Sequence, residues 1–211
     1  MKDPFVYADK ALKSLYDTIE REFSNYALSL AGFDELNVVQ VRTLTENLYS
    51  TLDREVRKKY LDILMSRYRE VLKEVGSDSD KELGTADLIR ILQEYNKTVK
   101  YQYENEWQRK KDRLVESVMG TEDSQEMRAT VVTGLNAVEA QTRFFADIMV
   151  DEATMQAYRD SGVLMVAWYT REDERVCKHC GERHAQVFSI DEAPVIPAHP
   201  RCRCWYIPIF A

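Results

Sequence analysis

The chain has 211 residues, of which 45% are hydrophobic and 31% are charged, and its formal net charge at pH 7 is -7. This length allows one large or two small domains with buried cores, and the composition excludes a disordered chain. The acidic balance argues against a dedicated nucleic-acid-binding protein, which usually carries a basic excess. No stretch has the run of apolar residues that a membrane span or a signal peptide needs, so we expect a soluble protein made in a cytoplasm.

The first part of the sequence predicts two long helices. Between Asp9 and Ala31, apolar residues recur at spacings of three and four, the pattern of one buried helical face. A second helix is expected to begin at a capping box of Thr43 and Glu46 and to stop at Gly76. Because this long segment contains no proline, we expect it to form half of an antiparallel helical hairpin.

Four further helices follow in the prediction. They are a short helix marked by Leu88, Leu92 and Tyr95, a helix from about Tyr101 to Met119, a helix from Thr121 to Val150, and a short helix that ends at Gly162. Thr121 is the expected N-cap of the third of these, because the acidic Glu122 and Asp123 follow it and favour a helix N-terminus.

The character of the sequence changes after Gly162. The segments VLMVAWYT, QVFSI and CWYIPIF are rich in β-branched and aromatic residues and are predicted strands. The expected fold class is therefore mainly α (α+β), with long antiparallel helices followed by a small β-rich C-terminal unit. The expected division is an N-terminal helical domain over 1–120, a helical connector over 121–160 and the β-rich unit over 161–211.

All four cysteines lie in two short stretches of this last unit, RVCKHCGERH and HPRCRC. Cys177 and Cys180 have the CxxC spacing, and His199 and Cys202 repeat it, so two tight turns can bring four donors to one tetrahedral ion. On an extended strand, residues 202 and 204 share a face. An all-cysteine site with Cys204 in place of His199 is therefore also open.

Other roles for the cysteines are free thiols or, outside a cell, disulfides, but in a reducing cytoplasm thiols more often bind metals. The sequence has no H-E-x-x-H motif and no zinc-deaminase motif, and Asp173 and Glu174 are expected to be solvated. We therefore expect a structural Zn²⁺, which can add on the order of 10 kcal/mol to the stability of a small unit. His179 and His184 are expected at the surface.

The segment from WYTREDERVC to CRCWYIPI resembles the C-terminal signature of the Mu F-like phage head morphogenesis proteins, also called minor capsid proteins. The matching residues are Trp168, Thr170, Asp173, Val176, Cys177, Cys180, Phe188, Pro197, His199, Pro200, Cys202, Arg203 and Cys204. The resemblance covers roughly residues 95 to 211. It departs from the family pattern beside His184, where many relatives have a glycine-type hairpin residue and this chain has Ala185.

The resemblance implies a bacteriophage or prophage virion protein that acts in head morphogenesis. Such a protein is made in the host cytoplasm, binds the portal protein and is packaged in the capsid interior near the portal vertex, where scaffold or major capsid protein is a further candidate partner. Some relatives carry a toxin or ADP-ribosyltransferase domain after the signature, whereas this chain stops seven residues after Cys204. We therefore expect no enzymatic activity.

A basic cluster in the sequence WQRKKDR supports a second hypothesis. Arg109, Lys110, Lys111 and Arg113 are candidate contacts to packaged DNA or to an acidic portal surface. We favour the simpler interpretation, in which they form the solvated face of a helix whose Trp107 and Leu114 point inward. The alternative functions are a DNA-binding or DNA-co-ejected internal virion protein and, more weakly, a zinc-dependent nuclease or transferase.

Overall fold

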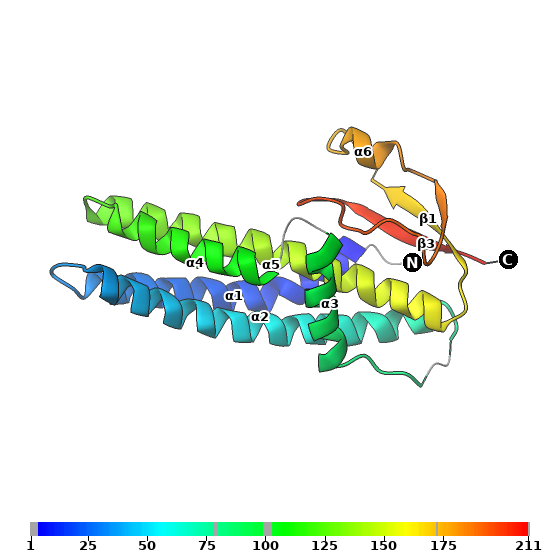
Figure 1. Cartoon of the computed structure of the whole chain (residues 1–211), viewed down its shortest axis with the longest axis horizontal. Coiled ribbons are helices and arrows are strands. Elements are labelled where there is room, and N and C mark those ends of the chain that lie inside the picture. Colours follow the sequence, from blue (N-terminus) through cyan, green and yellow to red (C-terminus); the bar gives the residue numbers. More distant parts are fainter. Residues whose placement is uncertain (1–3, 78–79, 99–102, 172, 211) are drawn as a thin grey trace. The chain divides into compact units, whose positions relative to one another are not determined.

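The computed structural model describes residues 4–77, 80–98, 103–171 and 173–210. These residues form six helices and three strands (Figure 1). The helices are α1 (Pro4–Ala31), α2 (Val38–Glu74), α3 (Thr85–Thr98), α4 (Tyr103–Met119), α5 (Ser124–Asp160) and the single turn α6 (Lys178–Gly181). The strands are β1 (Met165–Thr170), β2 (Val187–Ser189) and β3 (Cys204–Ile209). The predicted fold class, mainly α with a small C-terminal β unit, is confirmed.

Contacts within the chain group it into two compact units, each built from segments that are distant in sequence. The helical unit consists of Ala11–Lys59 and Leu92–Arg143. The mixed unit consists of Met1–Lys10, Tyr60–Ile91 and Phe144–Ala211. The division into domains over 1–120, 121–160 and 161–211 stays a prediction.

In the helical unit, parts of α1, α2, α4 and α5 pack together (Figure 1). The Tyr26 hydroxyl of α1 lies 2.8 Å from the Thr45 hydroxyl of α2. From α4, Tyr103 donates a hydrogen bond of 2.6 Å to Asp53 of α2. A β-carbon placed on Gly134 of α5 would come within 3.0 Å of Leu114 of α4, so these two helices approach closely there.

The second helix begins earlier than the sequence suggested. Asn37 caps it, because its side-chain oxygen accepts hydrogen bonds of 3.0 and 3.1 Å from two backbone amides of the first turn. The Asn37 amide in turn donates to the Gln40 side chain at 3.1 Å, which completes a capping box. The prediction of a capping box at Thr43 and Glu46 is therefore wrong. At the other end, Gly76 follows the helix with a φ of 71°, as the sequence predicted.

The two helices predicted around Val150 are one helix, α5. Asp123 is its N-cap, accepting hydrogen bonds from two amides of the first turn at 2.7 and 2.8 Å, whereas Thr121 donates to a backbone carbonyl of the preceding helix. The acidic residues after Val150 resemble a helix start, but burial continues on both sides of them, so the helix does not break. It ends at Asp160, before Gly162, which has a φ of 75°.

Two predicted features lie partly outside the described residues. The expected start of a helix at Tyr101 is one of them, and α4 is described from Tyr103 onward. The side chain of Tyr95 is the other. Within the described part of the chain, no helix combines the length and the apolar character that a membrane crossing requires.

In the mixed unit, the three predicted strands form one antiparallel sheet with β1 in the centre and the order β2-β1-β3. The core of this sheet includes Trp168 and Tyr206, which are at most 2% exposed and meet edge to face at 5.6 Å between ring centres. The sheet also contacts the end of α5, since the buried Tyr158 hydroxyl lies 3.5 Å from the Tyr206 carbonyl. The last residue of β1, Thr170, pairs with Cys204, the first residue of β3.

Candidate metal centre

The sheet register and one short helix position the cysteines. β1 leads into the loop that carries Cys177, and Cys177 is the residue that precedes α6. The sequence suggested only a tight turn here. Because α6 is a turn of helix, Cys177 and Cys180 lie three residues apart on the same side of it. His199 and Cys202 lie in the segment that leads into β3.

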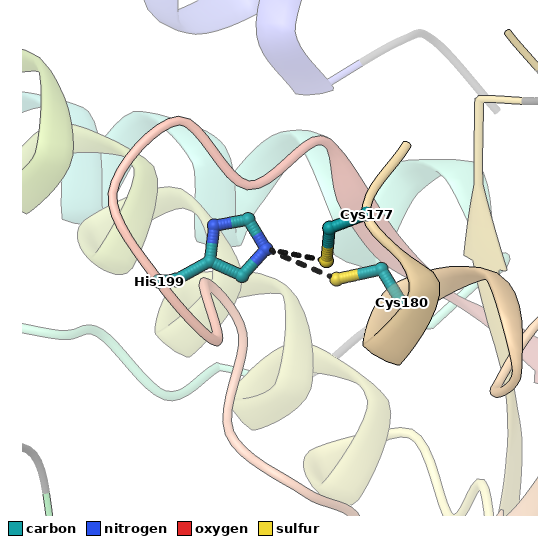
Figure 2. Close-up of side chains that lie close together, drawn as sticks. All are labelled: Cys177, Cys180 and His199. Carbon is teal, nitrogen blue, oxygen red and sulfur yellow. Dashed lines mark hydrogen bonds between the residues drawn. The ribbon is translucent and has the colours of Figure 1, made fainter. Parts of the chain in front are cut away.

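His199 points at two of the sulfurs, as Figure 2 shows. Its Nε2 atom lies 3.2 Å from Cys177 Sγ and 3.2 Å from Cys180 Sγ. Its Nδ1 atom lies 2.9 Å from the carbonyl oxygen of Pro200, which can only accept a hydrogen bond. Nδ1 therefore carries a proton, and Nε2 is the ring nitrogen that faces the sulfurs, the arrangement of a metal-binding histidine.

The donors form two overlapping groups. One group is Cys177, Cys180 and His199, and the other is Cys180, Cys202 and Cys204; within each group the donor atoms lie within 4.8 Å of one another. Cys180 belongs to both groups, and its sulfur lies 3.9 Å from that of Cys202. Two thiolates on one tetrahedral Zn²⁺, each at about 2.3 Å, are separated by about 3.8 Å. The residues present therefore fit a metal ion that binds sulfur and nitrogen.

All five donors predicted from the sequence lie in this cluster, and the four cysteines are free thiols. Cys180, Cys202 and Cys204 are each 2% exposed, whereas Cys177 is exposed. No disulfide joins these four cysteines in the structure.

The electrostatics show what the cluster requires in order to ionise. Burial and the neighbouring Cys202 raise the pKa of Cys180 to about 12. A hydrogen bond with Cys204, together with burial, raises the pKa of Cys202. A hydrogen bond from the Cys180 amide lowers the pKa of the exposed Cys177. The thiols of Cys180 and Cys202 therefore stay neutral unless a cation replaces their protons, as a divalent metal does when it binds.

An ion pair that the sequence did not predict joins the two ligand-bearing segments. Arg203, which lies between Cys202 and Cys204, donates from Nη1 to Asp173 Oδ2 at 2.6 Å and makes a second contact through Nη2. This hydrogen bonding lowers the pKa of Asp173. Asp173 is exposed, as expected, but its carboxylate is also paired with Arg203. No local spacing pattern could have revealed a pair thirty residues apart, although both residues belong to the matched signature.

The other two histidines lie outside both donor groups. His179 is exposed, as predicted, and contacts Arg183. His184 is half-buried, because its ring packs edge-on against Tyr169 and its Nδ1 accepts a 3.4 Å hydrogen bond from the Thr170 amide. The next residue, Ala185, has a φ of 62°, in the left-handed region that favours glycine. This is the position at which the sequence departs from the glycine-type residue of the family pattern.

The basic cluster lies on α4 in the helical unit. Arg109 and Arg113 are exposed, and Lys110 and Lys111 are half-buried. Arg109 and Arg113 lie on the exposed side of a helix whose Trp107 and Leu114 are buried, whereas Lys110 and Lys111 lie at the borders between these two sides.

Comparison with known proteins adds no identification. No family model matches the chain, and neither a curated protein nor a solved structure matches it. The resemblance to Mu F-like head proteins therefore stays a prediction made from the sequence.

Proposed function

We propose that Cys177, Cys180 and Cys202, with His199 or Cys204 as the fourth ligand, bind one structural Zn²⁺. The observation that carries this proposal is the shared position of Cys180, which joins two three-donor groups into one cluster of sulfur and imidazole. Sulfur and imidazole donors select zinc over the oxygen-preferring Mg²⁺ and Ca²⁺. Among the described residues, neither donor group includes a carboxylate.

The surroundings of the cluster favour a structural role over catalysis. A cavity beside Cys202 and Cys204 has a volume of about 20 Å³. That volume holds about one water molecule, so a substrate does not fit on this side of the cluster. A zinc-dependent nuclease or transferase is therefore the least supported of the candidate functions.

Metal analysis of the purified protein tests the site, and two variants test its fourth ligand. We expect one zinc ion per chain, and less than one in protein purified with zinc present contradicts the proposal. If His199 is the fourth ligand, Cys204→Ser keeps the zinc and His199→Ala loses it; the reverse pattern assigns Cys204. Cobalt substitution provides a second readout, because the visible spectrum reports the number of thiolate ligands.

We further propose that the chain is a non-enzymatic minor head protein of a bacteriophage that binds the portal and is packaged in the procapsid. The support is the sequence resemblance, whose matching residues build one physical unit. Trp168 lies in the sheet core, Asp173 and Arg203 form an ion pair, and the cysteines with His199 form the donor cluster. A signature that consists of core, ion pair and metal ligands is that of a folded module, not of a catalytic site.

Co-expression with the portal protein of the same phage tests this function. We expect the two proteins to co-purify, with the portal of an unrelated phage as the control. Failure to co-purify with its own portal, for a protein that contains its metal and is folded, contradicts the proposal.

The basic cluster on α4 favours one alternative, a DNA-binding internal virion protein that is ejected with the genome. Under this alternative, the chain binds duplex DNA with an affinity that falls steeply as salt is added. Substitution of Arg109, Lys110, Lys111 and Arg113 together should reduce both the affinity and its salt dependence. Absence of binding at low salt excludes this function.

A further inference from the structure

The helical unit contains a cavity of about 390 Å³ between α2, α4 and α5. Its lining includes Tyr49 from α2, the cations Arg109, Lys110 and Arg113 from α4, and Thr130 from α5. Sites for small organic ligands commonly have volumes of about 300 to 1,000 Å³. The cavity is therefore large enough for an organic molecule and not only for a single ion.

The charge of this cavity is one-sided. Three cations line it, and no carboxylate does so among the described residues. Arg109 is paired with Glu106 at 2.5 Å, whereas Lys110 and Arg113 have no carboxylate within ion-pair distance in the part of the chain that the structure describes. Burial lowers the pKa of Lys110, and the positive charges of Arg109 and Arg113 lower it further against the opposite effect of Glu106. A bound anion would relieve this repulsion.

The Tyr49 side chain points to a ligand independently of the charge. Tyr49 is 2% exposed, and its ring is held edge-on against Trp107 at 5.4 Å between ring centres. The Tyr49 side chain lines the cavity, yet its hydroxyl has no hydrogen-bond partner among the described residues. Because the rest of the Tyr49 side chain is buried, the cavity is where its hydroxyl group can meet a partner. A ligand oxygen in the cavity would supply the missing hydrogen bond.

We propose that this cavity binds a phosphate ester, with its phosphoryl group between Lys110 and Arg113 and its organic part against the apolar wall formed by Leu114 and Ala137. The planar guanidinium of arginine matches two phosphate oxygens at once, and lysine adds a point charge. Tyr49 then donates a hydrogen bond to the ligand. The phosphate comes either from a free ester of nucleotide size or from a nucleotide of single-stranded DNA. The proposal depends neither on the metal centre nor on portal binding.

The arrangement of cations on α4 provides a matched control. Lys111 is adjacent to Lys110 and carries the same charge, but it does not line the cavity. Diffuse electrostatic attraction of an anion to the helix would depend on both lysines to a similar extent. Binding inside the cavity depends on Lys110 alone.

Titration calorimetry with ADP, pyrophosphate and a single-stranded oligonucleotide tests the proposal on the full chain. We expect saturable binding of at least one of these ligands. Lys110→Met and Arg113→Gln should each weaken it by about ten-fold or more, since each removes a charged hydrogen bond to the phosphate. Tyr49→Phe should weaken it by about five-fold through loss of one hydroxyl, and Lys111→Met should leave it unchanged. Equal melting temperatures show that each variant is folded.

Two results overturn the proposal. One is the absence of saturable binding to all three ligands, and the other is an equal loss of affinity in Lys110→Met and Lys111→Met. The source of the phosphate follows from the ligands themselves. Binding of ADP that the oligonucleotide does not displace supports a free ester. Binding of the oligonucleotide that is lost in Lys110→Met and Tyr49→Phe but kept in Lys111→Met supports a nucleic-acid phosphate in the same cavity.

Discussion

Arg67 is a buried cation whose removal should destabilise the mixed unit far more than removal of an exposed arginine on the same helix. Only 1% of its side chain is exposed. Its Nη1 atom lies 3.2 Å from a carboxylate oxygen of Glu70 and 3.8 Å from one of Glu74, and its Nε donates to the Thr154 hydroxyl at 3.2 Å. The guanidinium therefore joins two acidic residues of α2 to α5.

The cost of Arg67→Ala follows from these contacts. Breaking a buried ion pair by removing one partner costs about 3 to 5 kcal/mol, because the other charge stays buried and unpaired. The side chains of Glu70 and Glu74 are each 22% exposed, so water compensates part of this loss. We therefore expect the lower end, about 3 kcal/mol, which lowers the melting temperature by roughly 6 to 12 °C in a chain of this size. Arg67→Met, which keeps much of the buried volume, should cost less.

Arg69→Ala is the matched control. It removes the same charge two residues further along α2, but Arg69 is 50% exposed and pairs with a Glu82 side chain that is 69% exposed. Exposed pairs of this kind contribute at most about 1 kcal/mol. Thermal unfolding followed by circular dichroism measures both variants. If Arg67→Ala melts within a few degrees of Arg69→Ala, the energetic reasoning about burial is wrong.

Two smaller perturbations test local features of the same unit. Burial opposes ionisation of Asp160, but hydrogen bonds from Tyr68 at 2.7 Å and Lys81 at 3.1 Å, among others, outweigh it, so the pKa of Asp160 is below its ordinary value. The contribution of the Asp160 carboxylate to folding stability is therefore complete above the unfolded-state pKa of about 3.9. It is lost as the pH falls through the lower pKa of the folded state. At neutral pH, Asp160→Asn should reduce the free energy of unfolding by about 1 kcal/mol and so lower the melting temperature. The difference in melting temperature between the variant and the original protein should shrink in acid. A difference that does not change with pH contradicts the lowered pKa assigned to Asp160. Ala185→Gly should raise the melting temperature slightly, because the left-handed backbone conformation costs alanine about 1 kcal/mol. The greater conformational freedom of glycine in the unfolded chain offsets only part of this gain. A fall in melting temperature would show that Ala185 is not strained.

Periodicity predicted which segments are helical, but it did not predict where each helix starts. The buried face of α2 shows the three-and-four spacing, yet the first turn is set by the Asn37 side chain, which lies outside that apolar pattern. After Val150 the prediction placed a helix boundary where the structure has a continuous helix. Asp151 and Glu152 look like the acidic first turn of a new helix, but Ala153 and Thr154 continue the buried surface, so tertiary packing keeps α5 intact.

The candidate metal donors were predictable because their spacing is a local property. CxxC places two sulfurs on one turn, and alternation along a strand places residues 202 and 204 on one face. The Asp173–Arg203 ion pair was not predictable in this way, because it depends on the pairing of β1 with β3. The same long-range pairing decides which residues come close enough to act as the fourth ligand. Spacing alone therefore left open whether His199 or Cys204 takes that role.

The sheet in the mixed unit changes the expected role of a bound metal in stabilising the protein. From the sequence, a β-rich unit of about fifty residues was expected to gain much of its stability from a metal. In the structure the buried Trp168 and Tyr206 form a core to which Tyr158 of α5 adds a contact, and Cys204 is buried on the same face of β3 as Tyr206. The strands are therefore held partly by helix packing. The metal would instead fix the segments that carry its ligands, namely α6 and the approach to β3. Hydrogen exchange after chelation should accordingly increase at the α6 amides while the central strand β1 stays protected. Equal loss of protection in both would mean that the sheet itself depends on the metal.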